Sequence, residues 1–213
     1  MIIVSNHRPP CTQGEKKSNA FRTVSRPSMP IIRLDDCLAK PWKNGLGRTR
    51  EIAVHPSNAG MDDFLWRISV AEVDSAAPFS IFPGIDRVIT LLDGDGFNMT
   101  LDGERTHALT TPCAPFAFAG EAQVAVTLAG GPTRDFNLMV RRSRARGDVR
   151  ACRDAGILAL DDAVVLVYCA RGMIASAEGT LRAGDAWRPS PHAASLCVHP
   201  DAVALVVRVA EAT

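Results

Sequence analysis

Three arginines within or beside strand-like runs are the side chains of this sequence with the clearest chemistry. Arg50, Arg67 and Arg87 each adjoin β-branched and apolar residues. A guanidinium matches a carboxylate with two parallel hydrogen bonds, so these arginines are candidates for binding an acidic metabolite. An arginine that pointed into a barrel would have to pair with an acid or hold an anion, because an unpaired buried charge is costly.

Strand alternation predicts which polar groups share a face with these arginines. Arg67 and Ser69 fall on one face of their run, and Asp135 and Asn137 fall together on one face of another. The bulky side chains of the two runs occupy the opposite faces: Trp66, Ile68, Val70, Phe136, Leu138 and Val140. The alternatives are that the polar set lines a pocket or that Arg67 simply pairs with Asp135.

A glycine-containing loop precedes the first of these arginines. Lys43 and Asn44 are followed by Gly45 and Gly47, whose lack of a side chain lets backbone N–H groups approach a ligand. Trp42 would add an apolar wall to the pocket or would cap the barrel core. The loop is therefore included in the predicted ligand-binding set.

Two carboxylates leave acid–base chemistry open. Burial would raise the pKa of Glu51 or Asp135 and suit either for proton transfer. The alternative is that Arg50 and Glu51 only make ordinary ion pairs. The sequence contains no Ser-His-Asp order, nucleophile elbow, phosphate-binding loop or dinucleotide fingerprint. We assign no catalytic residue.

Composition excludes several partners. The 213 residues include 24 Lys and Arg against 23 Asp and Glu, and this net charge of +1 provides no field that would recruit nucleic acid or an anionic membrane. No run approaches the length of a membrane helix and no signal-peptide core is present, so a cytoplasmic location is expected. The six cysteines are widely scattered, which indicates that most are buried thiols and that there is no dense disulfide framework of the kind found in small secreted domains.

Short apolar runs separated by Gly, Pro and Asp predict an all-β sandwich or barrel with few short helices. Asp102-Gly103 lies between runs short enough for a hairpin. We expect a flexible tail at residues 1–28, a first barrel carrying the pocket at 29–140, an arginine-rich solvated connector at 141–153 and a second, smaller barrel at 154–213. The connector has no interleaved aromatic residues, so binding to nucleic acid is not expected.

Four sequence blocks resemble the HutD/Ves family. They occur in the family's order along the chain. The first block is Pro41-Trp42-Lys43-Asn44-Gly45 with Thr49-Arg50-Glu51-Ile52, and the second is Trp66-Arg67. The third is Phe79-Ser80-Ile81-Phe82-Pro83-Gly84, and the fourth is Pro115-Phe116-Ala117-Phe118 with Asp135-Phe136-Asn137. The resemblance covers the first barrel strongly and the second only by its β pattern. It implies a bicupin fold of two antiparallel jelly-roll barrels, a possible homodimer, and a link to histidine utilisation or stress response.

Metal-dependent cupins present several histidines and a glutamate on adjacent strands, because a divalent ion needs convergent lone pairs. The five histidines here have no paired spacing: His7, His55, His107, His192 and His199. The positions where such ligands would fall carry Phe82, Pro83, Asp86, Arg87 and residues 116–118. We therefore predict a protein with no metal and no other cofactor.

The favoured hypothesis is a non-catalytic binding or regulatory protein for a small carboxylate metabolite. The first alternative is a metal-independent isomerase or lyase in which Glu51 or Asp135 is the base and Arg67 fixes the substrate. The second is a structural or partner-binding protein whose pocket is vestigial.

Overall fold

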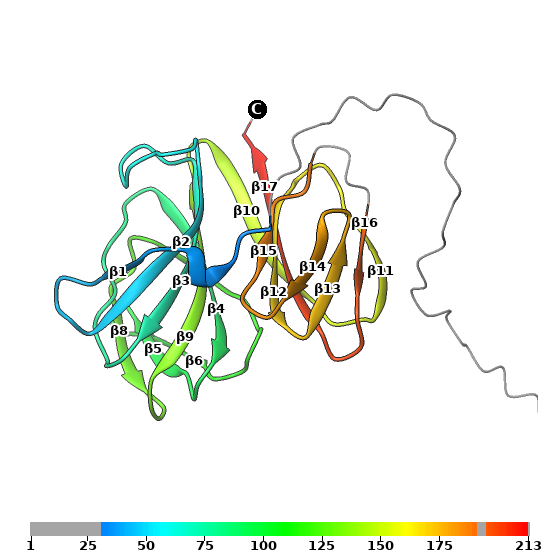
Figure 1. Cartoon of the computed structure of the whole chain (residues 1–213). Helices are drawn as coiled ribbons and strands as arrows, with labels where there is room; N and C mark the ends of the chain where they lie inside the picture. The colour runs from blue at the N-terminus through cyan, green and yellow to red at the C-terminus, as the bar shows by residue number, and fades with distance from the viewer. Residues whose placement is uncertain (1–30, 191–194, 213) are drawn as a thin grey trace, which may run out of the picture.

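The computed structural model describes residues 31–190 and 195–212, and this part of the chain is folded into two antiparallel β-barrels (Figure 1). The helical structure within it consists of the short 3-10 turn η1 (Leu34–Asp36). The predicted tail at 1–28 and the suggested start of order at Met29 lie outside the described residues. The all-β prediction is confirmed.

The first barrel consists of two facing sheets. The six-stranded sheet contains, in spatial order, β1 (Ala39–Pro41), β2 (Gly47–His55), β3 (Trp66–Val73), β9 (Thr133–Arg141), β4 (Ile85–Asp93) and β7 (Phe116–Ala119). The three-stranded sheet contains β6 (Arg105–Leu109), β5 (Phe97–Leu101) and β8 (Val124–Leu128). Asp102 and Gly103 have positive φ in the turn between β5 and β6, so the predicted hairpin is present.

The second barrel consists of two four-stranded sheets. One contains β10 (Ala145–Cys152), β17 (Val203–Glu211), β12 (Val164–Arg171) and β15 (Ala186–Trp187). The other contains β11 (Gly156–Ala159), β16 (Ser195–Val198), β13 (Met173–Ser176) and β14 (Gly179–Arg182). Figure 1 shows this barrel beside the first, with the chain crossing between them from β9 to β10.

The prediction of a connector at 141–153 is wrong for most of its length. Strand β10 pairs with β17 from Ala145 to Cys152, and it forms the edge of its sheet. Ala145 and Val149 are buried while Arg146 and Arg150 are exposed, as alternation along an edge strand requires. The arginines therefore belong to the solvent-facing side of a strand.

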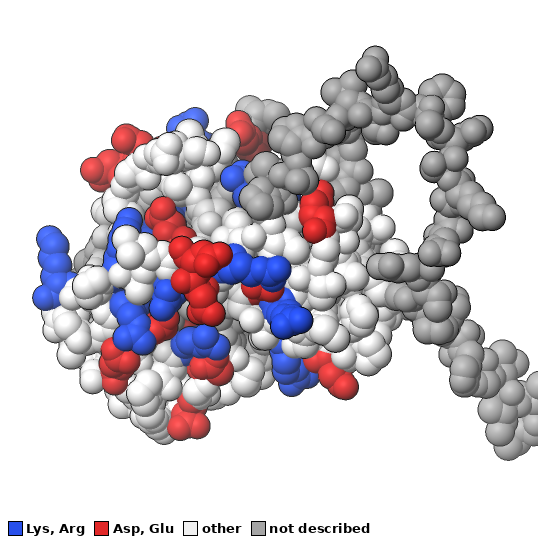
Figure 2. Space-filling view, viewed as in Figure 1, with Lys and Arg blue, Asp and Glu red and all other residues white. Residues whose placement is uncertain are grey.

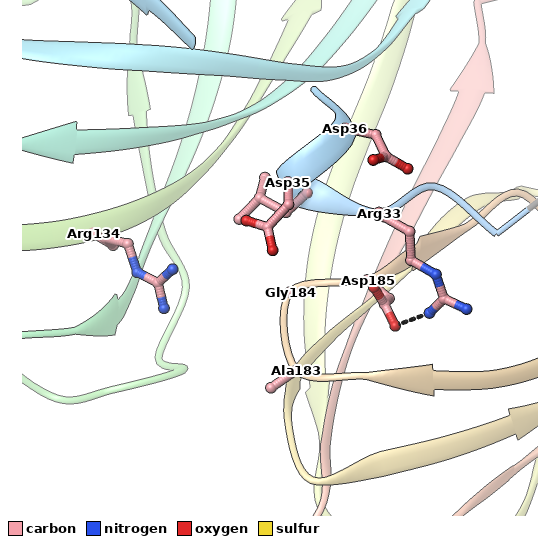
Figure 3. Close-up of a pocket in the computed structure, with 8 residues that line it drawn as sticks. Arg33, Asp35, Asp36, Arg134, Ala183, Gly184 and Asp185 are labelled. Atoms are coloured by element: carbon pink, nitrogen blue, oxygen red, sulfur yellow. Dashed lines mark hydrogen bonds and ion pairs between the residues drawn. The ribbon is translucent and has the colours of Figure 1, made fainter. Parts of the chain in front are cut away.

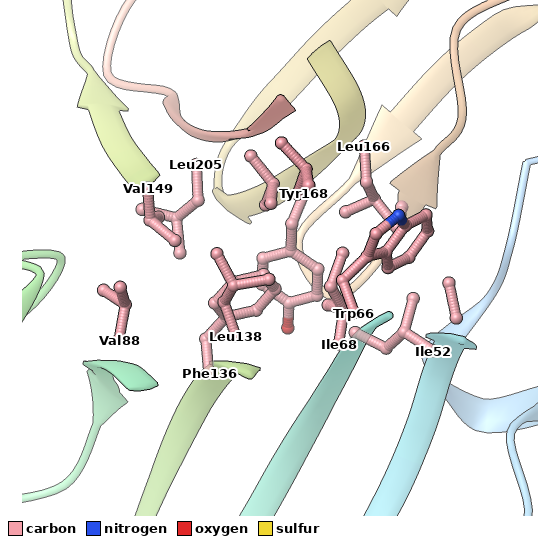
Figure 4. Close-up of a cluster of buried hydrophobic side chains, with 14 of the residues drawn as sticks. Ile52, Trp66, Ile68, Val88, Phe136, Leu138, Val149, Leu166, Tyr168 and Leu205 are labelled. Atoms are coloured by element: carbon pink, nitrogen blue, oxygen red, sulfur yellow. The ribbon is translucent and has the colours of Figure 1, made fainter. Parts of the chain in front are cut away.

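The largest apolar cluster joins the two barrels (Figure 4). Trp66, Ile68 and Leu138 of the first barrel pack with Leu166 and Leu205 of the second. The rings of Phe136 and Tyr168 also meet across this junction, with centroids 5.1 Å apart. Because one face of β3 and β9 is buried in this way, their other face must line the interior of the first barrel.

A separate apolar cluster fills much of the space between the two sheets of the first barrel. Ile89 and Leu91 of β4 contact residues of the three-stranded sheet, including Phe97, Met99 and Leu101. The polar residues of β3 and β9 that face the same interior must therefore find their partners in a largely hydrocarbon environment.

A segment preceding β1 contacts the second barrel. Ile32 forms an antiparallel bridge with Ala186, and Arg33 forms an ion pair with Asp185. Leu34 is buried in the cluster that joins the barrels. This segment therefore ties the start of the first barrel to the second.

Candidate functional site: the interior of the first barrel

Strand register gathers six of the predicted polar residues, Glu51 among them, on the interior face of the six-stranded sheet. Arg67 and Arg87 lie on either side of Met139, and Ser69 lies opposite Asn137. Asp135 is two residues from Asn137 on the same strand and therefore has the same orientation. The alternation predicted for β3 and β9 is confirmed.

Arg67 forms an ion pair inside this face. Its Nε donates to Oε2 of Glu51 at 2.7 Å, and Glu51 lies opposite Ser69 in the register of β2 and β3. The exposed fractions of the two side chains are 14% and 32%, so the pair is sheltered at the edge of the interior. The partner of Arg67 is Glu51, and the alternative pairing with Asp135 is not observed.

Arg87 has no carboxylate partner within the described ranges. The residue is only 9% exposed, and its one hydrogen bond is a long contact of 3.5 Å from a terminal nitrogen to Oδ1 of Asn137. Its Nε is buried without an acceptor. Burial, with a smaller contribution from Arg67, lowers the pKa of Arg87 to about 10, so it remains charged at neutral pH.

Three phenyl rings surround the guanidinium of Arg87. Its Cζ lies 4.9 Å from the ring centroid of Phe118, 5.0 Å from that of Phe79 and 5.4 Å from that of Phe82. Such contacts attract a cation electrostatically but provide no hydrogen-bond acceptor of carboxylate strength. The cage therefore holds Arg87 in place and leaves part of its donor capacity unused.

The aromatic cage is the part of the site that sequence reasoning missed. Phe118 lies opposite Arg87 in the register of β4 and β7, whereas Phe79 and Phe82 come from the loop between β3 and β4. This loop is held to the barrel by the Phe79 N–H, which donates to the carbonyl of Val124 at 3.0 Å. Phe82 and Phe118, two of the aromatic residues predicted to stand where a metal-dependent cupin would carry ligands, thus lie against the unpaired arginine together with Phe79.

Asp135 is a second buried group with an unused atom. It is 1% exposed, its Oδ1 accepts a 3.3 Å hydrogen bond from Oγ1 of Thr133, and its Oδ2 has no partner in the described part of the chain. Burial raises the pKa of Asp135 to about 7, assisted by Asp93 and opposed by the Thr133 hydrogen bond. Asn137 contacts both Arg87 and Asp135: its Oδ1 accepts the 3.5 Å contact from Arg87, and its Nδ2 donates to the backbone carbonyl of Asp135 at 3.2 Å.

The structure does not bring Arg50 into this set. Arg50 lies opposite Val70, on the face that turns away from the barrel interior, and its Nε donates to Glu72 at 3.0 Å. A terminal nitrogen of Arg50 also donates to the carbonyl of Cys37 at 2.8 Å. The prediction that Arg50 shares a pocket with Arg67 and Arg87 is wrong. Arg50 and Glu51 are consecutive in β2, so their side chains point to opposite faces of the sheet, and it is Glu51 that faces the interior.

The loop of residues 42–45 forms the turn between β1 and β2. Lys43, Asn44 and Gly45 are exposed, and Oδ1 of Asn44 accepts the N–H of Leu46 at 3.1 Å. Trp42 is half-buried and its Nε1 donates to Oγ1 of Thr49 at 2.8 Å. Of these residues, Trp42 alone has a side-chain bond to the strand that carries Glu51, and the others stand at the solvent side of the turn.

Gly47 has a packing role at the start of β2. A Cβ at this position would lie 2.5 Å from the carbonyl oxygen of Glu72 and 3.0 Å from the ring of Trp42. No other residue would allow β2 and the indole to approach this closely without a shift of the backbone.

The histidines do not gather into a ligand set. The described residues contain no group of three or more His, Cys, Asp or Glu side chains placed to hold a metal ion. The ring of His55 stacks on Trp66 and that of His107 stacks on Phe116, so both are engaged with aromatic partners. The expectation of a metal-free protein stays a prediction.

Two hollows are found on the surface of the described part of the chain. One, of about 400 Å³, lies between the barrels, and its arginines are already paired: Arg33 with Asp185, as Figure 3 shows, and Arg134 with Asp93. The other, of about 370 Å³, is mostly apolar and is lined by Phe79 and Ile81 and by residues of β5 and β8. Neither is lined by a buried arginine without a carboxylate partner, as Arg87 is, so we assign the site to the barrel interior.

The charged surface gives no competing site. Figure 2 shows Lys and Arg side chains interspersed with Asp and Glu on one face of the molecule. Arg142, from the predicted connector, forms ion pairs with Asp86 and Glu121. In the described part of the chain no helix is long and apolar enough to cross a membrane.

The two jelly-roll barrels and their antiparallel order define the chain as a bicupin. Residues 34–206 match the HutD family model, and the chain belongs to the HutD family. It is 39% identical over 142 residues to an uncharacterized 21.2 kDa protein in the hutC 3' region of Pseudomonas putida, covering 67% of this chain and 74% of that protein. It is 37% identical over 153 residues to protein Ves of Citrobacter koseri, covering 71% and 78% respectively.

A solved relative supports the same conclusion. The structure of HutD from Pseudomonas fluorescens SBW25 is 30% identical, superposes with a TM-score of 0.76, and covers 87% of this chain and 100% of that one. The match extends through both barrels, so the bicupin architecture predicted from the first-barrel motifs holds for the second as well.

Proposed function

We propose that this protein binds a small carboxylate metabolite inside its first barrel and acts as a binding or regulatory protein. The observation that carries the proposal is Arg87, a charged group 9% exposed whose Nε has no acceptor and which has no acid partner among the described residues. A carboxylate would supply two acceptor oxygens and the missing negative charge together. A terminal nitrogen of Arg87 contacts Oδ1 of Asn137 at 3.5 Å, and the Arg67–Glu51 ion pair lies on the same face of the sheet.

Family membership guides the choice of ligand. The relative in P. putida is named for its position in the hutC 3' region. The HutD structure from P. fluorescens carries the words "formate condition" in its name. We therefore propose a role in histidine utilisation and a ligand among its carboxylates. A cytoplasmic location and a homodimer remain part of the same proposal.

Thermal-shift measurements test this function directly. The chain is heated with histidine, urocanate, formylglutamate, glutamate or formate, and with chloride at equal ionic strength as the reference. A ligand that binds the native state raises its stability by mass action, so a saturable increase in Tm is expected for at least one carboxylate. The R87M variant is expected to lose that increase, and Arg67→Ala is expected to weaken it. A saturable response that is equal in wild type and R87M would contradict the assignment to this barrel.

A second candidate function is a metal-independent isomerase or lyase. It is favoured by Asp135, whose buried carboxyl has a pKa raised to about 7 and could exchange a proton with a substrate at neutral pH. Incubating the bound carboxylate with the protein and following it by ¹H NMR in D₂O distinguishes the two functions. Exchange of a substrate C–H proton, or a new product, that is lost in D135N would establish the enzyme, whereas an unchanged spectrum supports the binding protein.

A further inference from the structure

Two buried polar atoms without partners face the same barrel interior and have opposite chemical character. Nε of Arg87 is a donor that lacks an acceptor, and Oδ2 of Asp135 belongs to a carboxyl group that lacks a donor. The two groups do not pair with each other, although Asn137 contacts both residues. A buried polar group is normally satisfied, so each orphaned atom indicates a missing neighbour.

The charge balance of this interior depends on Asp135. Asp93 of β4 is the charged side chain whose field acts on Asp135. The other titratable or charged side chains at interior-facing positions of the neighbouring strands are Glu51 of β2, Arg67 of β3, Arg87 of β4, and His107 and the solvent-exposed Arg105 of β6. Arg67 is balanced by Glu51, and Asp93 is balanced by Arg134. Burial, with a contribution from Arg105, lowers the pKa of His107 and so favours its neutral imidazole. Arg87 and Asp135 thus set the net charge.

We propose that the protonation state of Asp135 determines whether the first barrel accepts an anion, the neutral acid permitting binding and the carboxylate opposing it. This inference rests on the proposed function and adds a pH-dependent specificity to it. With Asp135 neutral, the interior has one unbalanced positive charge, which one monovalent carboxylate cancels. With Asp135 ionised, the interior is already balanced, and an added anion meets a like charge in a medium of low dielectric constant.

The neutral form of Asp135 also explains its hydrogen bonding. A protonated carboxyl has an O–H that can donate to a ligand oxygen, whereas an ionised carboxyl only accepts. An ionised Oδ2 with no donor would be more costly than a neutral one in this environment, since the residue is 1% exposed. The raised pKa of Asp135, about 7, places the change of state in the physiological range.

Formate is the probe for the test, because it is small and remains ionised throughout the range used. Its affinity is measured by NMR titration at about pH 6.5 and about pH 8.5, at constant ionic strength with chloride as the balancing anion. We expect formate to bind wild type about tenfold more weakly at the higher pH, as Asp135 ionises. Equal affinities at the two pH values would overturn the inference.

Two conservative variants locate the effect. D135N keeps a donor and removes the ionisation, so it is expected to bind formate equally at both pH values and as tightly as wild type does at the lower one. D93N removes a neighbouring carboxylate that is half-exposed, and it is expected to keep most of the wild-type pH dependence. A full wild-type profile in D135N would assign the titration to another group and refute the proposal.

The wild-type chain also provides a test that needs no variant. The ¹³C resonance of the Asp135 carboxyl is followed through a pH titration, with a midpoint expected near neutrality and displaced upward by saturating formate, because linkage is reciprocal. A midpoint below about 5 would overturn the inference. Loss of binding in R87M together with a flat wild-type profile would remove only the role of Asp135. Undiminished binding in R87M would instead remove the proposed function.

Discussion

Replacement of Arg87 by methionine separates a ligand-binding arginine from a structural one. The depression of the pKa of Arg87 from 12.5 to about 10 corresponds to a cost of about 3 kcal/mol for keeping the buried group charged. Its unpaired Nε adds about 1–3 kcal/mol. The three phenyl rings offset about 1 kcal/mol each, and methionine would keep the packing against them.

We therefore expect R87M to be more stable than wild type in the absence of ligand, by about 1–2 kcal/mol, which corresponds to an increase in Tm of about 3–6 °C for a chain of this size. The assay is calorimetry or dye-monitored melting, with and without formate. R87M should melt at the higher temperature and show no response to formate. This combination would mean that wild type is less stable than R87M because it keeps a buried charge that ligand binding requires.

Arg67→Met is the matched control, because it removes the paired arginine. Glu51 would then lose the charge it contacts at 2.7 Å, so R67M is expected to be less stable than wild type. If R87M instead lowered Tm and still responded to formate, Arg87 would be a structural cation held by its aromatic cage, and the reasoning above would be refuted.

Three further outcomes are expected. Burial raises the folded-state pKa of Asp135 to about 7, so its contribution to stability is greatest at low pH and falls by about 3 kcal/mol between pH 4 and pH 7. Urea denaturation of D135N should lack this fall, and a parallel loss in D135N would contradict the prediction. Gly47→Ala should lower the free energy of unfolding by about 1–3 kcal/mol, because the new Cβ would lie 2.5 Å from the Glu72 carbonyl oxygen. Gly60→Ala is the control: the space around Gly60 is open, so this variant should be nearly as stable as wild type in the same urea denaturation assay. Leu138→Ala should lower the free energy of unfolding by about 2–5 kcal/mol, because it leaves a cavity in the apolar cluster that joins the barrels. Two separate melting transitions in calorimetry would show that the two barrels no longer unfold together.

Local sequence pattern was sufficient for the strands that build the site. Alternation assigned Arg67 and Ser69 to the same face of β3, and Asp135 and Asn137 to the same face of β9, as the structure has them. The reason is that a strand has a period of two, so the face of each side chain follows from its neighbours once one face is apolar. The same pattern indicated the barrel rhythm and the Asp102-Gly103 turn.

Pairing between distant strands could not be read in this way. Arg50 and Glu51 are adjacent in sequence, yet Glu51 lies opposite Ser69 at the interior and Arg50 lies opposite Val70 on the other face. A shift of one residue in register exchanges the two, and sequence alone does not specify it. For the same reason the arginine-rich run at 145–152 could not be recognised as a strand, because its pairing with β17 involves residues near the other end of the chain.

By itself, the sequence determined the fold class, the family and the set of polar side chains available for a site, since these depend on local periodicity and on motifs that are continuous along the chain. The tertiary structure alone decided which of those side chains are paired and which are not. Glu51 neutralises Arg67, while Arg87 is enclosed by rings from a loop and from β7. Whether a buried charge has a partner depends on contacts between residues far apart in the chain, and that difference distinguishes an ion pair from a site for an anion.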